Sequence, residues 1–357
     1  MLYGSQVRLT PNNFYSCGCP TCTCNFRINY KTPQYVIDCI TSLREKTKGI
    51  TYEIIVVDND SGDNSVSVLK ETFGNTITLI ESDSNLGFGR ANNLGAKYAT
   101  GKYLFLLNSD TLLVNNALKI LFDYIEHNEK IGVVGGNLYT RDMSPNNSYS
   151  DEFLSADQFK KQARWSSIIY SMISCKVLHK FRSGKARQRL AYKGHYNFTD
   201  FPQKVAFIFG ADMMLKKSIF DQVGGFDPRF FMYAEEEELS WRIAKAGYCS
   251  VCVPDAKIIH FDGGSFSKAD EASRISRYRI RQTGDMTYCL IVLGAEGLRN
   301  YYEARMLFFQ RRYITLGKLL RNSRLISAGE QEKKLLTEVY EGVLCKHGLA
   351  RNDVKTT

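Results

Sequence analysis

The sequence lacks any long run of apolar residues. The most apolar stretches, such as YCLIVLGA at 288–295, fall well short of the roughly 20 residues needed to span a bilayer. The N-terminus lacks the continuous apolar core of a signal peptide. The chain also lacks a nucleic-acid-binding signature such as an RNP stretch or a zinc-finger spacing. We therefore expect a cytoplasmic protein that does not bind nucleic acid.

Positive charge is concentrated in two segments. The net charge is +10, and Lys and Arg gather in 160–193 and 274–324, which favours an anionic partner surface. We expect peripheral contact with an anionic membrane surface, on its cytoplasmic face. For the C-terminal segment, a solvated pair of helices packed on the main domain is the alternative.

Ten cysteines in a chain of 357 residues do not indicate a disulfide framework, which is typical of short secreted chains. Four of them are clustered near the N-terminus: Cys17, Cys19, Cys22 and Cys24. Their density allows a zinc site, but two C-x-C pairs are not the usual zinc spacing. An irregular, cysteine-rich extension over 1–24 is the preferred interpretation.

Short β-branched runs alternate with helical segments from residue 24 to 136. This rhythm is typical of a mostly parallel sheet covered by helices, an α/β fold. Five strands are predicted, at 24–29, 53–58, 76–81, 102–108 and 131–136. Thr32 and Pro33 predict a helix start after the first strand, and 65–73 and 116–125 repeat the helical pattern. The first strand is unusual because Asn25 and Arg27 interrupt a run that is normally apolar.

Beyond residue 136 the pattern changes. A basic insertion at about 141–200 is predicted to lie beside the functional site as a lid. Strand and helix signals return at 205–217, 235–246 and 248–253. The last segment, 269–357, is predicted to be a basic helical extension.

Polar residues follow two predicted strands, at the carboxyl edge where open α/β sheets bind ligands. Asp58 ends EIIVVD and Asn59 follows it, where a carboxylate accepts from a base N–H or a ribose hydroxyl, or simply caps a turn. Asn108 and Asp110 follow KYLFLL, and an aspartate there suits Mg²⁺ or Mn²⁺, which prefer oxygen ligands. Aspartates after strands are also common turn formers.

Gly87 and Gly89 precede a helix that is predicted to start near Arg90. Glycines let the backbone approach a ligand, a helix start favours negative charge, and Arg90 can reach a diphosphate. The segment is not a dinucleotide-binding fingerprint, because the third glycine is missing at the required spacing and the segment follows a third strand.

Four consecutive glutamates, Glu235 to Glu238, begin the predicted helix at 235–246. Acidic residues in a first helical turn interact favourably with the helix dipole. Four adjacent like charges also repel, and beside the preceding aromatic residues one of them is expected to have a raised pKa suited to a general base. His260 ends the run AKIIH; such a histidine is commonly structural, but together with Asp110 it can complete a metal shell.

Seven motifs occur in order over about 25–268. They are NYKT (29–32), VVDNDS (56–61), NLGFGRANNLG (85–95), LLNSD (106–110), GADMMLKK (210–217), GGFDPRFFMYAEEEELSWRIAKAGY (224–248) and IIHFDGGS (258–265). Together they resemble glycosyltransferase family 2, and within it the rhamnosyltransferase-like branch. The resemblance implies a GT-A catalytic domain over 25–268 with helices on both faces of the sheet, followed by the helical C-terminal extension.

The resemblance also implies roles for individual residues. Asn29, Tyr30, Asp58 and Asn59 match positions that bind base and ribose, Arg90 a diphosphate contact, and Asn108 a nucleotide contact. Asp110 matches the metal ligand of the family's D-x-D motif, and His260 the histidine that approaches the metal or diphosphate. Glu235 and Glu236 match the family's acidic pair, whose second member is the catalytic base. That member is usually Asp, so a neighbouring glutamate is the alternative to Glu236.

The implied activity is inverting transfer of a sugar, with rhamnose as first candidate, from a nucleotide-diphosphate donor to a lipid-linked or surface polysaccharide precursor. Such transfer serves cell-wall or O-antigen biogenesis, and Mg²⁺ or Mn²⁺ is the implied cofactor. The interrupted first strand suggests a non-catalytic nucleotide- or glycan-binding subunit as the alternative. A nucleotidyltransferase is disfavoured because NYKTPQ is not a glycine-rich basic loop.

Overall fold

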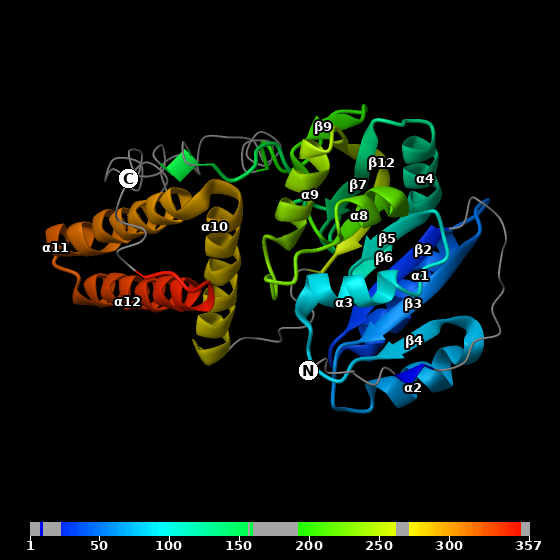
Figure 1. The fold of residues 1–357 in the computed structure, drawn as a ribbon, viewed down its shortest axis with the longest axis horizontal. Coiled ribbons are helices and arrows are strands. Elements are labelled where there is room, and N and C mark those ends of the chain that lie inside the picture. Colours follow the sequence, from blue (N-terminus) through cyan, green and yellow to red (C-terminus); the bar gives the residue numbers. More distant parts are fainter. Residues whose placement is uncertain (1–7, 10–22, 156–157, 160–191, 262–270, 351–357) are drawn as a thin grey trace. The chain divides into compact units, whose positions relative to one another are not determined.

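The computed structural model describes residues 8–9, 23–155, 158–159, 192–261 and 271–350, which form two compact units (Figure 1). The first unit is a sheet covered by helices. In the described residues, the second consists of the C-terminal helices together with 154–155, 158–159 and the short segment Met232–Ala234.

The first half of the sheet unit alternates strands and helices as predicted. Its elements are β1 (Arg8–Leu9), β2 (Thr23–Asn29), α1 (Pro33–Lys46), β3 (Tyr52–Asp58), α2 (Ser65–Phe73), the 3₁₀ turn η1 (Gly74–Thr76), β4 (Thr78–Glu81), α3 (Gly87–Ala96), β5 (Tyr103–Leu107), β6 (Thr111–Leu113), α4 (Ala117–Glu126) and β7 (Ile131–Tyr139). Pro33 opens α1 as predicted, although the side chain of Thr32 makes no capping hydrogen bond. The helix α3 begins at Gly87 and not near Arg90, so both glycines lie inside its first turn.

The second half is less regular. It contains β8 (Tyr149–Ser150), β9 (Gln203–Val205), β10 (Phe207–Ile208), β11 (Asp212–Lys216), α8 (Lys217–Gln222), α9 (Glu235–Lys245) and β12 (Cys249–His260). The last strand is longer than the predicted 248–253 and continues to His260. As a result, that histidine stands at the end of a strand.

The ten strands of the main sheet in the described part of the chain follow the order β1-β4-β3-β2-β5-β11-β7-β12-β6, with β9 paired to β12. β2 is parallel to β3 and β5, whereas β11 is antiparallel to both of its neighbours. The unusual strand β2 is therefore central, and its Arg27 is fully buried, with Nε donating to Sγ of Cys39 at 3.0 Å.

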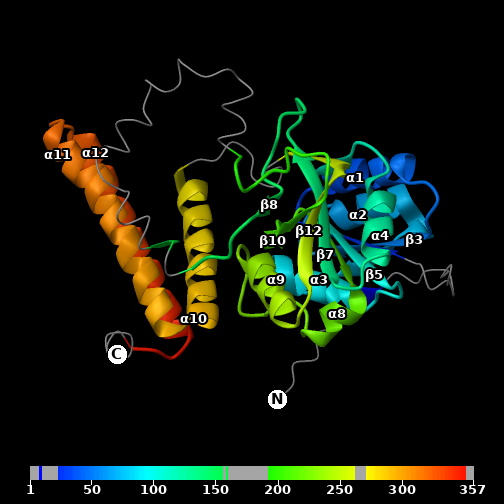
Figure 2. The ribbon, with the colours of Figure 1, turned by 90° about the horizontal axis from the view of Figure 1, so that it is seen from above.

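Helices cover both faces of the sheet (Figure 2). Side chains of α1, α2 and α4 pack on one face, and side chains of α3, α8 and α9 pack on the other. Strand β3 illustrates why: Ile54 and Val56 point into the first core, while Ile55 and Val57 point into the second. A strand with both faces buried needs such a continuous apolar run.

The second unit is a helical bundle. It contains α10 (Glu271–Phe309), which is kinked at Gly294, the π-helical segment η3 (Gln310–Thr315), α11 (Leu316–Leu319) and α12 (Ser323–Lys346). Its core includes Met286, Leu298 and Leu336, and the rings of Tyr302 and Tyr340 stack with centroids 4.2 Å apart. The predicted helical C-terminal extension is thus present.

Some predictions fall outside the described residues. Most of the predicted lid at 141–200 does, since 160–191 are not described, and so do Cys17, Cys19 and Cys22. Cys24 is a buried residue of β2. The division into 1–24, 25–268 and 269–357 stays a prediction. None of the helices in the described residues is both long and apolar enough to cross a bilayer.

Candidate active site

The carboxyl ends of β2 and β3 meet in a buried turn. Asn29 and Asp58 are partners in the parallel register, and Asn29 Nδ2 donates to Asp58 Oδ2 at 2.6 Å. The hydroxyl of Ser61 donates to the same oxygen at 2.7 Å, and the Ser61 amide donates to Asp58 Oδ1 at 3.1 Å. Asn29, Asp58 and Ser61 are at most 4% exposed. The Asp58 carboxylate therefore holds this turn in shape.

A second set of hydrogen bonds joins this turn to the start of α3. Asn59 Oδ1 accepts from the Leu86 amide at 2.8 Å, and Asn59 Nδ2 donates to Asn85 Oδ1 at 3.0 Å and to the Gly87 carbonyl at 3.2 Å. Arg90 Nε donates to the Leu86 carbonyl at 2.7 Å, which holds the guanidinium at the helix start. Hydrogen bonds therefore connect the turn after β3, which carries Asp58 and Asn59, to the start of α3, which carries Arg90.

Gly87 is required by a close approach to a distant segment. Its φ is +75°, and a Cβ at this position would lie 1.9 Å from the carbonyl oxygen of Phe231. The next amide, that of Phe88, donates to the same oxygen at 2.9 Å. The start of α3 is therefore fixed against the segment that leads to the four glutamates.

Asp110 and His260 come together although they are far apart in the sequence. β6 pairs antiparallel with β12, which places His260 opposite Thr111, the neighbour of Asp110. His260 Nε2 lies 3.4 Å from Asp110 Oδ1, and the two side chains are 15% and 11% exposed. The amide of Phe261 also donates to the Asp110 carbonyl at 3.0 Å.

This pair fits a divalent cation. Two neighbouring ligands at roughly 2.1 Å from one ion lie about 3 Å apart, close to the 3.4 Å between Asp110 Oδ1 and His260 Nε2. Within the described residues no cluster of three His, Cys, Asp or Glu side chains forms a metal site. A cation held by these two side chains would keep positions for phosphate oxygens and water, the mode of binding usual for Mg²⁺.

The segment Gly210–Ala211 connects this pair with the glutamates. The amide of Asn108 donates to the Ala211 carbonyl at 3.0 Å. A Cβ on Gly210 would lie 3.1 Å from the Phe88 ring and 3.9 Å from the carboxyl carbon of Glu236. Asn108 and Glu236 therefore face the same short stretch of backbone from different elements.

The four glutamates have different surroundings. Glu235 is 2% exposed, and its Oε2 has no hydrogen-bond partner among the described residues. Burial, and then the charge of Glu236, raise the pKa of the Glu235 carboxyl well above its ordinary value. Glu238 is held by Arg242 through two hydrogen bonds of 2.6 Å, and Glu237 is buried. Glu236 is the partly exposed member of the four.

The backbone immediately before these glutamates is strained. Tyr233 has φ of +71° and Ala234 has φ of +66°, values in the left-handed region that side chains other than glycine rarely adopt. Each such residue costs about 1–3 kcal/mol and persists only where neighbouring structure enforces it, often at functional sites.

Several site residues were not found from the sequence. Ser61 and Gly210 lie inside recognised motifs but were assigned no role. Phe261 stands beside the Asp110–His260 pair, with the Tyr35 ring centroid 6.0 Å away and the Arg141 guanidinium 4.9 Å from its own ring centroid. Only its place after His260 could have indicated it.

Tyr30, 39% exposed, carries the Lys31 ammonium 5.4 Å from its ring centroid.

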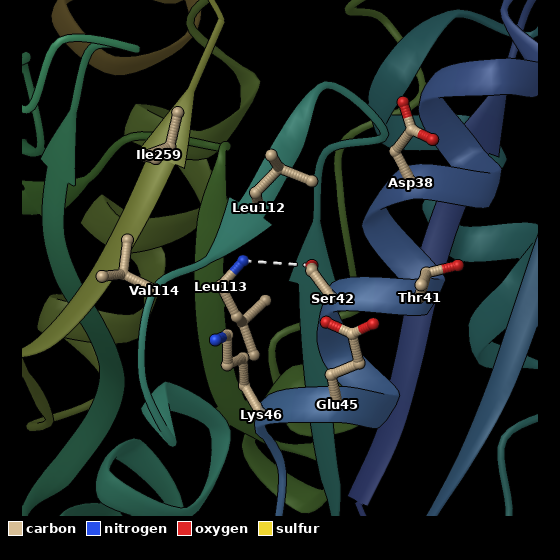
Figure 3. Close-up of a pocket in the computed structure, with 9 residues that line it drawn as sticks. All are labelled: Asp38, Thr41, Ser42, Glu45, Lys46, Leu112, Leu113, Val114 and Ile259. Atoms are coloured by element: carbon tan, nitrogen blue, oxygen red, sulfur yellow. Dashed lines mark hydrogen bonds between the residues drawn. The ribbon is translucent and has the colours of Figure 1, made fainter.

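A separate groove of about 440 Å³ lies between α1 and the edge strand β6 (Figure 3). Asp38, Glu45, Leu112 and Ile259 are among its lining residues, and the Ser42 hydroxyl accepts from the Leu113 amide at 3.1 Å. That hydrogen bond satisfies an outward amide of an edge strand. None of the predicted site residues lines this groove.

The mostly parallel sheet with helices on both faces is the GT-A fold. The chain belongs to glycosyl transferase family 2, whose family model matches residues 27–224. The match ends before Glu235, Glu236 and His260, so their roles rest on the motif resemblance and the geometry.

Known proteins resemble parts of the chain. The N-acetylglucosaminyl-diphospho-decaprenol L-rhamnosyltransferase of Mycobacterium tuberculosis is 40% identical over 74 residues, 21% of this chain and 24% of that protein. Glycosyltransferase GlyG of Streptococcus pneumoniae is 29% identical over 122 residues, 34% of this chain and 40% of that protein. The chain thus matches less than half the length of these relatives. A mannosyltransferase from Pyrobaculum calidifontis, solved with GDP-Man and Mn²⁺, has a TM-score of 0.49 and 14% identity, covering 91% of this chain and 86% of that one.

Proposed function

We propose that this protein is an inverting glycosyltransferase that moves a sugar, rhamnose being the first candidate, from a nucleotide-diphosphate donor to a lipid-linked or surface polysaccharide precursor. The observation that carries the proposal is the meeting of three parts around Gly210–Ala211. The first part is Asn108 at the end of β5, two residues before Asp110 of the Asp110–His260 pair. The second is the start of α3 at Phe88, and the third is Glu236.

The donor is proposed to bind along the carboxyl edge of β2 and β3. Asn29, Asp58 and Asn59 shape a rigid cradle for base and ribose, and Tyr30 offers an exposed ring beside it. The diphosphate is directed to the start of α3, where backbone amides after Gly87 and the Arg90 guanidinium favour negative charge. Asn108 contacts the nucleotide from the end of β5.

Glu236 is proposed as the general base. Its carboxylate takes the proton of the acceptor hydroxyl as that oxygen bonds to the anomeric carbon, and the bond from this carbon to the diphosphate breaks with inversion. Asp110 and His260 would hold Mg²⁺ or Mn²⁺, and the bound cation would supply positive charge to stabilise the departing diphosphate. Burial raises the pKa of the Glu235 carboxyl and favours its neutral form, so Glu236 is the preferred base of the pair.

The relative from Mycobacterium tuberculosis supports rhamnose and a lipid-linked acceptor, because its name states both. Transfer of a sugar to a membrane-anchored acceptor is consistent with a protein that lies on the cytoplasmic face of the membrane. Such a place is proposed here, as is a role in cell-wall or O-antigen biogenesis.

The turn between α11 and α12 supports membrane contact. Leu319 and Leu320 are 66% and 62% exposed at this turn, and Lys318, Arg321 and Arg324 surround them in the sequence. The turn is well defined, since the Asn322 amide donates to the Gly317 carbonyl at 2.8 Å. Three cations near an anionic surface contribute about 3 kcal/mol, and partial insertion of two leucines adds a similar amount.

A non-catalytic nucleotide- or glycan-binding subunit is the second candidate. Fully buried Arg27 in the central strand β2 favours it, because a buried charge is costly. Against it, β2 still pairs with β3 along its whole length and delivers Asn29 to the site.

The deciding experiment is a screen of nucleotide sugars by thermal unfolding, with and without Mn²⁺, combined with an assay for sugar transfer or donor hydrolysis. A donor present at 100 times its Kd stabilises by about 2.7 kcal/mol, a shift of roughly 5–10 °C in Tm. Asp110→Asn should lose the Mn²⁺-dependent part of this shift. Stabilisation without any turnover would support the non-catalytic subunit. The absence of stabilisation by every donor would contradict nucleotide-sugar binding.

A further inference from the structure

The short segment before the glutamates packs with the C-terminal helices. Met232–Ala234 belongs to the helical unit, while the chain on either side of it belongs to the sheet unit. Gly284 of α10 makes this possible, because a Cβ there would lie 2.4 Å from the Tyr233 carbonyl oxygen and 3.0 Å from the Met232 carbonyl oxygen. At this point the helix backbone and the segment are in direct contact.

The same segment contains the strained backbone. Tyr233 and Ala234 are two successive residues with left-handed φ, and neither is glycine. An isolated chain would not keep this conformation, so surrounding structure must impose it. Gly284 of α10 packs directly against this backbone, and the next residues along the chain are Glu235 and Glu236.

The part of α10 around Gly284 is itself held firmly. Gln282, Gly284 and Met286 are buried. The Tyr301 hydroxyl lies 3.0 Å from Gln282 Oε1 and 2.9 Å from Asp285 Oδ2. Since Tyr301 follows the kink at Gly294, these contacts tie the two limbs of α10 together. Hydrogen bonding between the two limbs restrains the part of α10 around Gly284.

We propose that Gly284 is a positioning residue for the catalytic base. By admitting the Met232–Ala234 backbone onto α10, it fixes the left-handed pair that directs Glu236 toward the acceptor hydroxyl. This inference rests on the proposed function, with Glu236 as base.

The test compares Gly284→Ala with Gly342→Ala in steady-state sugar transfer. The added methyl at 284 must displace the Tyr233 carbonyl, so kcat should fall by about 10- to 100-fold, as expected for a base misplaced by about 1 Å. The KM for the donor and the thermal protection by nucleotide should stay at wild-type values. Gly342 lies in α12 of the same unit with nothing within 4 Å of a Cβ, so its variant should match the wild type.

Ala234→Gly supplies a second variant that adds no atoms and carries the test if Gly284→Ala does not fold. It loosens the left-handed pair, so kcat should fall several-fold with an unchanged donor KM. In both variants, hydrogen exchange of the amides at 233–236 should be faster, whereas that of β3 and β5 should be unchanged. Wild-type kcat in the variants that fold, or a donor KM that rises as much as kcat falls, would overturn the proposal.

These readouts separate the inference from the function on which it rests. A wild-type protein that transfers no sugar would refute the proposed function, but hydrogen exchange at 233–236 would still test the packing on Gly284. Active wild-type protein with unchanged exchange and kcat in the variants would refute the inference alone.

Discussion

At the scale of single residues, the surroundings of the four glutamates assign them different chemistry. Glu238 is committed to Arg242, and Glu235 is buried with an oxygen that no described residue satisfies. Glu236 is left partly exposed next to Gly210. The sequence shows four equivalent carboxylates, because their difference arises from the burial of Glu235 in the folded chain and from the pairing of Glu238 with Arg242. The sequence could predict where the base lies but not which of the four glutamates it is.

The buried Glu235 predicts a pH-dependent stability. Its pKa is raised on folding from the ordinary value of 4.5, so above this value the folded protein binds more protons than the unfolded chain. The stability that this group contributes is fully present below pH 4.5 and is lost as pH rises through the folded pKa. The free energy of unfolding of Glu235→Gln should therefore rise relative to that of the wild type as pH rises, by up to about 1.4 kcal/mol per pH unit in that window.

Urea unfolding of both proteins between pH 4.5 and 8 measures this difference. Glu71→Gln, at an exposed position of α2, is the control and should show no such trend. A constant gap between Glu235→Gln and wild type across the range would show that Glu235 is ionised in the folded protein at all these pH values.

At the scale of elements, Asn59 links β3 to the start of α3. Asn59→Ala would leave the Leu86 amide without its acceptor and remove two further hydrogen bonds to the turn at 85–87. A buried unsatisfied amide costs about 1–3 kcal/mol. We therefore expect a loss of this size in the free energy of unfolding, together with weaker donor binding.

Denaturant unfolding and nucleotide titration measure the two effects. Asn75→Ala, at an exposed position in η1, should change stability by less than about 0.5 kcal/mol. If Asn59→Ala were as stable as Asn75→Ala, the proposed link between the strand and the helix would be wrong.

The strand ends were predictable because their cause is local. Asp58 and Asn108 end apolar runs, and strands joined by helices align in parallel, so their carboxyl ends share an edge. The start of α3 was not predicted correctly, because Gly87 is placed by the Phe231 carbonyl, which lies far along the sequence. Arg27 is a different case. A charged residue is unusual in a central strand, yet β2 forms in the centre of the sheet.

The turn between α11 and α12 gives a prediction for the membrane. The double variant Leu319→Asp, Leu320→Asp should reduce sedimentation with vesicles containing phosphatidylglycerol by roughly tenfold or more. The variant loses insertion of the two apolar side chains, and its new carboxylates oppose the attraction of the turn to anionic lipid. Binding of the wild type should weaken at high salt and on vesicles of phosphatidylcholine alone. Phe201→Asp, at a 76% exposed position of the sheet unit, is the matched control. Equal sedimentation of the Leu variant and this control would contradict insertion of the turn.

At the scale of the whole molecule, the fold class could be predicted from the sequence, but the assignment of segments to the two compact units could not. Alternating periodicity indicated the sheet with helices on both faces, and the basic C-terminal segment indicated helices. The membership of Met232–Ala234 in the helical unit depends on Gly284, which the sequence shows as an ordinary glycine within a helix. Contacts between distant segments of this kind carry no periodic signal.

The most direct measurement of the account compares Glu236→Gln with Glu235→Gln, recording sugar transfer and donor protection on the same preparations. The account predicts that Glu236→Gln binds the donor like the wild type and loses about 10²- to 10⁴-fold in turnover. Glu235→Gln should keep most of its turnover. The opposite result, with turnover retained in Glu236→Gln and lost in Glu235→Gln, would contradict the assignment of the base.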